Sequence, residues 1–170
     1  MFDVSLPSNH AIALLKRDHD TVKGLFDAFD KARTPAAKKK IVAQAVTELE
    51  IHATLEEEIF YPTVCPLVGE QMANEAYEEH HVVQVLVTDL GRDQNDHNDA
   101  KFTVLAESVR DHITEEEDQM LAKAGALDID FIELGRRMLK RKRELLALFG
   151  HPANGVLSRK LKPKPGKVKA

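Results

Sequence analysis

Two short patterns pair a histidine with a glutamate at a spacing that suits metal binding. His52 and Glu56 lie four residues apart, and His112 and Glu116 repeat that spacing later in the chain. On a helix, residues four apart project from the same face, so the imidazole nitrogen and the carboxylate oxygen of each pair can bind one cation. None of the other six histidines has a glutamate four residues after it.

Each pair is preceded by a further histidine at a nearly constant distance. His19 lies 33 positions before His52, and His80 lies 32 positions before His112. This spacing indicates two copies of one helical hairpin, each carrying an isolated histidine and a His-x-x-x-Glu pair. Four helices with these side chains turned inward would form a two-metal centre in the core of a bundle. The predicted metal ligands are His19, His52, Glu56, His80, His112 and Glu116.

The surrounding sequence predicts the helices that position these side chains. Apolar residues recur at intervals of three and four, as is typical of amphipathic helices, over residues 8–33, 34–62, 70–90 and 99–125. Each of the four histidines falls in the apolar stripe of its helix. A single inward histidine would be interpreted as a hydrogen-bonded core residue. Six inward polar groups need a shared partner, because unpaired charges are costly in a core, and cations supply one.

Local signals place the ends of the first two helices. Ser8 or Asn9 can cap the first helix, because short polar side chains accept hydrogen bonds from the first free backbone N–H groups. The Thr34-Pro35 dipeptide is typical of an N-cap followed by the first helical residue, and it predicts the start of the second helix. Pro62 predicts its end.

A shorter fifth helix follows, capped by Asp128 or Asp130. Residues 136–170 contain 12 lysines and arginines and one acidic residue, although the whole chain has a net charge of −4. Lys-Pro repeats with almost no apolar content predict disorder at the C-terminus. We therefore expect an all-α protein: an antiparallel up-down four-helix bundle with an extra C-terminal helix over residues 1–150, and a disordered basic tail over residues 151–170.

Composition limits the fold class, the cellular location and the binding partners that we expect. Charged residues make 31% of the chain and aromatic residues 5%, which suits helices better than a sheet. The single cysteine, Cys65, excludes an intrachain disulfide, and we interpret it as structural. No secretory signal and no apolar run of membrane-spanning length are visible, so we expect a cytoplasmic protein without membrane contact. No aromatic residue interleaves the lysines of the tail, so we do not expect a nucleic-acid partner. The sequence carries no signal for an oligomeric state.

Residues next to the six predicted ligands have weaker signals. Glu57 and Glu117 directly follow ligands and are expected to orient other ligands from behind. His81 is rotated about 100° from His80 around the helix, so we expect it to point outward unless the register shifts by one residue. A ferritin-like centre would need two Glu-x-x-His motifs, and only Glu78 and His81 have that spacing.

At these motifs the chain resembles the hemerythrin-like, or HHE cation-binding, family. The matching segments are LLKRDHD around His19, LEIHATLEEEIFYP around His52, EEHHVV around His80 and VRDHITEEED around His112. They span roughly residues 8–125. The resemblance implies a four-helix bundle that binds two iron ions as a non-haem, carboxylate-bridged pair. It also implies that the four histidines are terminal ligands and that Glu56 and Glu116 bridge the ions.

The chain departs from the oxygen-carrying members of that family in two places. Those proteins have a fifth histidine one turn from the third-helix ligand, whereas Ala76 and Gln84 flank His80 here. They also use a longer His-to-Asp spacing on the last helix, where this chain has His112 and Glu116. An extra carboxylate or a water can fill the vacant coordination position.

These features predict a non-haem di-iron protein that binds or senses O2, NO or peroxide at an open coordination position. A di-iron enzyme with the same ligands, acting as an oxidase, a peroxidase or an NO-consuming protein, is an alternative. A bundle that stores iron, or that holds a purely structural metal, is another.

Overall fold

The computed structural model describes residues 6–92 and 98–149, and it is helical throughout apart from short connections. The elements are α1 (Ala11–Lys31), α2 (Pro35–Leu55), η1 (Glu56–Phe60), α3 (Tyr61–Val68), α4 (Glu70–Arg92), α5 (Asn98–Glu115), η2 (Glu116–Leu121), α6 (Ala122–Ala124) and α7 (Phe131–Phe149). The elements η1 and η2 are single π-helical turns. Each continues the preceding helix, so η1 and α3 extend α2, and η2 and α6 extend α5.

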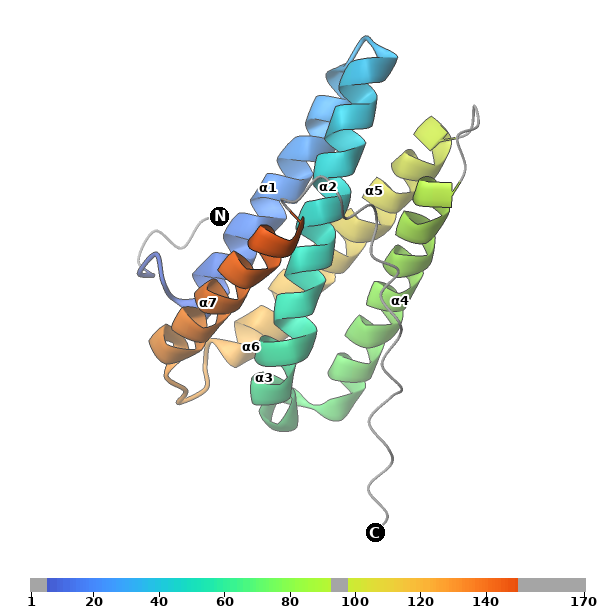
Figure 1. Ribbon diagram of the computed structural model, residues 1–170. Coiled ribbons are helices and arrows are strands. Elements are labelled where there is room, and N and C mark those ends of the chain that lie inside the picture. The colour runs from blue at the N-terminus through green and yellow to red at the C-terminus, as the bar shows by residue number, and fades with distance from the viewer. Residues whose placement is uncertain (1–5, 93–97, 150–170) are drawn as a thin grey trace.

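Four long helical rods form the bundle. α1 packs against α2 and α4 packs against α5, while α7 lies outside the bundle against α1 and α2 (Figure 1). The predicted all-α four-helix bundle with an extra C-terminal helix is therefore confirmed. No helix in the described part of the chain is long and apolar enough to cross a membrane. The predicted tail over residues 151–170 lies outside the described residues.

The N-cap residue of α2 is the one predicted from the sequence, whereas the N-cap residue of α1 is not. The Thr34 hydroxyl accepts a hydrogen bond from the Ala37 N–H at 3.2 Å, and Pro35 is the first helical residue. The N-cap of α1 is His10, without a side-chain cap bond, rather than Ser8 or Asn9. The reason is a turn in which the His10 N–H bonds to the Pro7 carbonyl at 2.9 Å, leaving residues 8 and 9 before the helix.

The expectation that the second helix ends at Pro62 was wrong. The rod continues through η1 into α3 and ends at Gly69, whose φ of 125° is in a region that favours glycine. Pro62 is tolerated because it stands in the first turn of α3, where a missing N–H group costs little. Gly125 closes the last rod as its C-cap residue, and the Asp130 carboxylate caps α7 by accepting from two backbone N–H groups.

The apolar core consists of two clusters with the predicted ligands between them. One cluster contains Leu15 and Phe60, and the other contains Phe26 and Phe102. Along α1, His19 lies between Leu15 of the first cluster and Val22 of the second. His52 and His80 also lie where their helices pass from one cluster to the other, and His112 lies near the end of the second cluster, between Val109 and Ile113. The fold therefore holds a polar layer inside apolar packing.

The extra helix α7 covers the α1–α2 face. Met138 and Leu145 of α7 are buried, whereas Ile132 and Leu146 are exposed, so only part of its apolar surface is used. Gly135 lies directly on the chain before α1, and a Cβ at this position would overlap the carbonyl oxygen of Asn9. The close approach of α7 thus depends on a missing side chain.

Replacing Gly135 by alanine should lower the free energy of unfolding by about 1–3 kcal/mol, because the overlap is with backbone that cannot rotate away. Chemical denaturation followed by circular dichroism measures this change. Gly24→Ala is the matched control: it lies in α1 with no atom within 4 Å of the added Cβ. That variant should be equally stable or more stable by up to about 1 kcal/mol. A Gly135→Ala protein as stable as Gly24→Ala would contradict the packing described for α7.

Candidate metal centre

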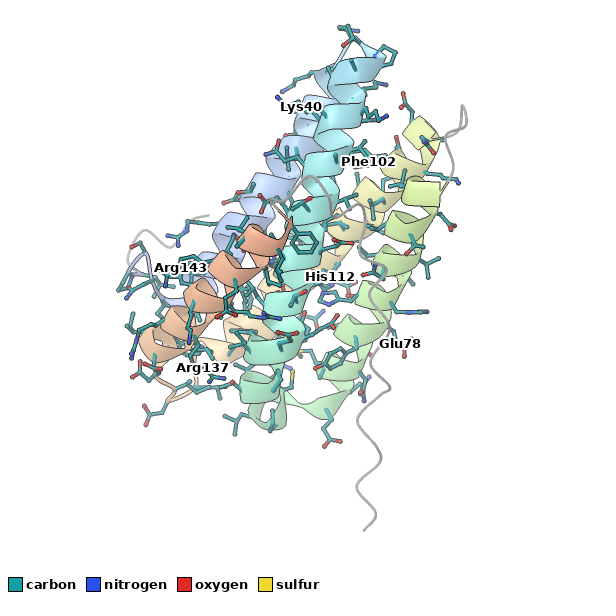
Figure 2. All side chains as sticks on the ribbon, in the orientation of Figure 1. Lys40, Glu78, Phe102, His112, Arg137 and Arg143 are labelled. Atoms are coloured by element: carbon teal, nitrogen blue, oxygen red, sulfur yellow. The ribbon has the colours of Figure 1, made fainter. Side chains whose placement is uncertain are left out.

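The structure brings the six predicted ligands together in the middle of the bundle. His19 comes from α1, His52 from α2, His80 from α4 and His112 from α5, while Glu56 and Glu116 are the first residues of η1 and η2. All six are buried, and none is more than 8% exposed. Figure 2 shows His112 turned into the bundle interior, in contrast to Glu78 near the outer side of α4. His81 is exposed, as predicted.

Four of these side chains converge on one point, which we call position 1. It is surrounded by His19, His52, Glu56 and Glu116, whose donor atoms all lie within 4.8 Å of one another. The Nε2 atoms of His19 and His52 are 3.1 Å apart. Oε1 of Glu56 lies 3.1 Å from His52 Nε2, and Oε2 of Glu116 lies 3.2 Å from His19 Nε2. Adjacent donors on a cation with bonds of about 2.1 Å at right angles would be about 3 Å apart, so the spacing fits a metal ion.

A second point, position 2, is surrounded by Glu56, His80 and His112, whose donor atoms also lie within 4.8 Å of one another. The Nε2 atoms of His80 and His112 are 3.1 Å apart, and His80 Nε2 is 3.2 Å from Oε2 of Glu56. The two oxygens of Glu56 thus face different positions, Oε1 toward position 1 and Oε2 toward position 2. This carboxylate is placed to join two cations.

Carboxylate oxygens without donors support a cation at position 1. Oε1 of Glu56 and Oε2 of Glu116 are buried and accept no hydrogen bond of good geometry in the described part of the chain, although they lie 3.1 Å from His52 Nε2 and 3.2 Å from His19 Nε2. An ionised carboxylate oxygen left in this state inside a protein is strongly disfavoured. The donor set, imidazole nitrogen with carboxylate oxygen, suits iron, manganese or zinc. The residues present therefore fit a bound metal.

The π-helical turns begin at the two carboxylate ligands. Glu56 opens η1 and Glu116 opens η2, at matching places in the two copies of the hairpin. Single π-turns inside α-helices are rare overall, and those that do occur are often found at functional sites. The spacing from His52 to Glu56 is still one turn, so the sequence pattern located both side chains without revealing the irregular backbone after them.

A carboxylate lies behind each histidine ring. His19 Nδ1 is 2.8 Å from Glu117 and His80 Nδ1 is 3.2 Å from Glu57, as expected for these two glutamates. His112 Nδ1 is 2.5 Å from Glu79, which the sequence analysis did not single out. A carboxylate can only accept, so Nδ1 carries the proton in these pairs and Nε2 is left to face the metal.

The fourth carboxylate belongs to Asp18, which was also missed. Its Oδ2 lies 3.9 Å from His52 Nδ1, too far for a hydrogen bond, and its Oδ1 accepts from Lys142 of α7 at 2.5 Å. Asp18 and Glu79 each directly precede a ligand, His19 and His80. Their common place in the two copies was the signal that could have identified them.

In the metal-free protein, the charges around the predicted ligands favour protonated histidines and an ionised glutamate. Burial alone would lower the pKa of His52, but the nearby carboxylates, first Glu56 and then Asp18, raise it to about 10. Burial likewise opposes protonation of His80, whose hydrogen bonds to Glu56 and Glu57 raise its pKa to about 9. Burial would raise the pKa of Glu56, but the His52 charge and the surrounding hydrogen bonds hold it well below its usual value. A bound cation would replace these protons.

Tyr61 is a site residue that the sequence analysis did not single out. Its hydroxyl donates to Oε1 of Glu116 at 3.1 Å and lies 3.3 Å from Oε2 of Glu56 and 3.5 Å from His80 Nε2. Burial, with the charges of Glu116 and Glu56, raises the pKa of Tyr61 well above its usual value, so the phenol stays protonated. The matching residue of the second copy, five positions after Glu116, is Leu121. The Tyr61 hydroxyl therefore lies beside position 2 without a counterpart.

Comparison with known proteins agrees with this geometry. The sequence model of the hemerythrin HHE cation binding domain matches residues 10–124. The chain belongs to this family. Membership in a hemerythrin HHE family and the buried histidine–glutamate cluster together indicate metal binding. The match includes all six predicted ligands and ends before α7 begins.

Two individual proteins are similar to this hemerythrin HHE domain. The fold matches the crystal structure of a hemerythrin HHE cation binding domain-containing protein from Mycobacterium kansasii with a TM-score of 0.74 and 23% identity, over 86% of this chain and 94% of that chain. A protein named DNA nickase from Nostoc sp. is 29% identical over 111 residues. That alignment covers 64% of this chain and 32% of the relative, so the chain spans about a third of the length of that curated protein.

Neutralising a carboxylate behind a ligand should weaken metal binding without removing a ligand. We expect Glu79→Gln or Glu117→Gln to lower metal affinity by roughly 10- to 100-fold, because each carboxylate fixes the ring and the proton of a ligating histidine. Competition with a chelating dye measures the affinity. Asp99→Asn serves as the control, since Asp99 pairs with Lys38 and contacts none of the six ligands. Equal affinities for all three variants would show that these carboxylates do not orient the ligands.

Proposed function

We propose that the protein holds two iron ions in a non-haem, carboxylate-bridged centre and uses it to bind or sense O2, NO or peroxide. The observation that carries the proposal is Glu56, whose two oxygens face two separate groups of histidine nitrogens. His19 and His52 would hold one ion and His80 and His112 the other. Glu116 would complete the first position, because its Oε2 faces His19 while its Oε1 accepts a hydrogen bond from Tyr61.

Iron is proposed on the strength of the hemerythrin resemblance. The nitrogen and oxygen donors alone would also suit manganese or zinc. When bound, iron supplies electrons and a coordination position that an oxygen- or nitrogen-containing molecule can occupy. The protein residues supply the rest: the carboxylates hold the protons on Nδ1 of the rings, and the apolar clusters on both sides exclude water.

An enzyme that consumes peroxide or NO is the second candidate, and Tyr61 is the observation that favours it. Its buried phenol keeps its proton and lies beside position 2, where its O–H group is within reach to donate a hydrogen bond to a small ligand. Turnover distinguishes the two candidates, because a binding protein forms a stable spectrum with its ligand whereas an enzyme consumes many equivalents per site.

DNA nicking, the activity in the name of the Nostoc protein, is not proposed for this chain. The alignment with that protein covers 32% of its length. Its activity as a whole protein therefore has no support in the residues that the two proteins share.

Removing one ligand should abolish stoichiometric metal binding. His52→Ala and Glu56→Ala each delete a donor at position 1, and Glu56→Ala also deletes the bridge to position 2. We expect both variants to lose metal and to unfold at lower temperature than the metal-loaded protein, because bound metal stabilises the folded state. Metal analysis, optical spectra before and after exposure to air, and thermal melts measure these effects.

His81→Ala is the matched control, because His81 is exposed beside His80 and lies outside both groups of donors. It should keep the wild-type metal content. Unchanged stoichiometry in both His52→Ala and Glu56→Ala would contradict the proposed centre. Wild-type protein with far less than one metal per chain after purification from iron-sufficient cells would favour a bundle without a functional metal.

A further inference from the structure

We propose that position 2 is the position that receives an external ligand, that the ligand enters between α4 and the α5–η2 rod, and that Ala76 sets the width of this entry. The proposal rests on the proposed function, because it names where and how a small ligand would reach the centre. It identifies the ligand class as neutral molecules of two to four atoms, namely NO, O2 or hydrogen peroxide.

A cavity of about 30 Å³ is lined by residues of α4 and of the α5–η2 rod. Its outer lining includes the exposed residues Glu75, Glu115 and Gln119, and its inner lining includes the buried residues His112 and Glu116. A water molecule needs about 10–15 Å³ measured in this way, so the space admits a small molecule. Two of the six donors line the cavity, His112 of position 2 and Glu116 of position 1. Oε1 of Glu116 accepts a hydrogen bond from Tyr61, whose hydroxyl lies 3.5 Å from His80 Nε2 of position 2.

Ala76 and Met120 form buried parts of the cavity wall. Ala76 lies one turn before His80, and the matching residue of the first copy, one turn before His19, is Leu15. Leu15 is fully buried, so a leucine fills the place at position 1 that an alanine leaves partly open at position 2. The two ends of a nearly symmetric centre therefore differ in the volume of one side chain.

Position 2 also has fewer protein donor atoms than position 1. Four protein donors gather at position 1 and three at position 2. Oε1 of Glu116, the oxygen that does not face His19, accepts a hydrogen bond from Tyr61. Position 2 thus combines fewer protein donors, a cavity and a nearby hydroxyl, which together suit binding of an added molecule.

Charges at the entry favour uncharged ligands. Glu75, Glu79 and Glu115 all line the cavity. Carboxylates at a narrow entry repel anions, and salt screens this repulsion. Azide should therefore bind slowly at low ionic strength and faster as salt is added, whereas the rate for NO should not depend on salt.

The test compares the rates of NO association with the iron-loaded full-length protein in a stopped-flow experiment. Ala76→Leu introduces the residue found at the matching place in the first copy, and it should slow association by about tenfold or more while the metal content stays at the wild-type value. Ala76→Gly should speed association. Ala73→Leu is the control, because Ala73 is also buried in α4 but does not line the cavity, and its rate should equal that of wild type.

The outcomes separate this proposal from the proposed function. An Ala76→Leu protein that binds NO as fast as wild type, or an Ala73→Leu protein that is slowed as much, would overturn the entry route and leave the di-iron function standing. A metal-loaded wild type that binds no NO, O2 or peroxide would overturn both. If Ala76→Leu fails to fold, as judged by the free energy of unfolding of the metal-free protein, a wild-type rate in Ala76→Gly would still refute the proposal.

Discussion

The burial of six ionisable side chains at one level of the bundle is the constraint on which the rest of the structure depends. Uncompensated charges in a protein interior cost several kcal/mol each, so they must be neutralised by partners at close range. In the metal-free protein, protons on His52 and His80 together with Glu56 provide part of this neutralisation. Oε1 of Glu56 and Oε2 of Glu116 lie within 3.2 Å of a histidine Nε2 but accept no hydrogen bond of good geometry in the described part of the chain. A cation can satisfy both oxygens and both rings of position 1 at once.

The internal repeat explains how one chain positions so many groups. Asp18 lies behind His52 within the first copy, and Glu79 lies behind His112 within the second. Between the copies, Glu57 lies behind His80 and Glu117 behind His19. Each ring therefore faces a carboxylate from one neighbouring rod, and holding all four rings requires all four rods to be in register. Two differences between the copies affect position 2. Leu15 of the first copy corresponds to Ala76 of the second, and Tyr61 of the first corresponds to Leu121 of the second.

The sequence was sufficient to predict the six inward residues, because helical spacing determines which side chains share a face. His81 could be assigned outward by the same rule, since it is rotated away from His80. Contacts between helices could not be predicted in this way. Glu79 and Tyr61 reach the centre because of the rotation and separation of neighbouring rods, which spacing along one helix does not encode. The π-turns after Glu56 and Glu116 were missed because a constant helical period was assumed, and the same assumption ended the second rod too early, at Pro62.

Helix α7 links the periphery of the molecule to the centre, although it lies beyond the matched hemerythrin region. Lys142 holds one oxygen of Asp18, whose other oxygen faces the ring of His52. The neighbouring Arg141 donates to Glu58 at 2.8 Å, next to the glutamate that orients His80. Half-exposed ion pairs contribute little to stability in general, so these contacts matter chiefly for where the carboxylates point. Because Gly135 lets α7 approach the start of α1, the packing of this helix and the orientation of the His52 side of the centre depend on the same close contact.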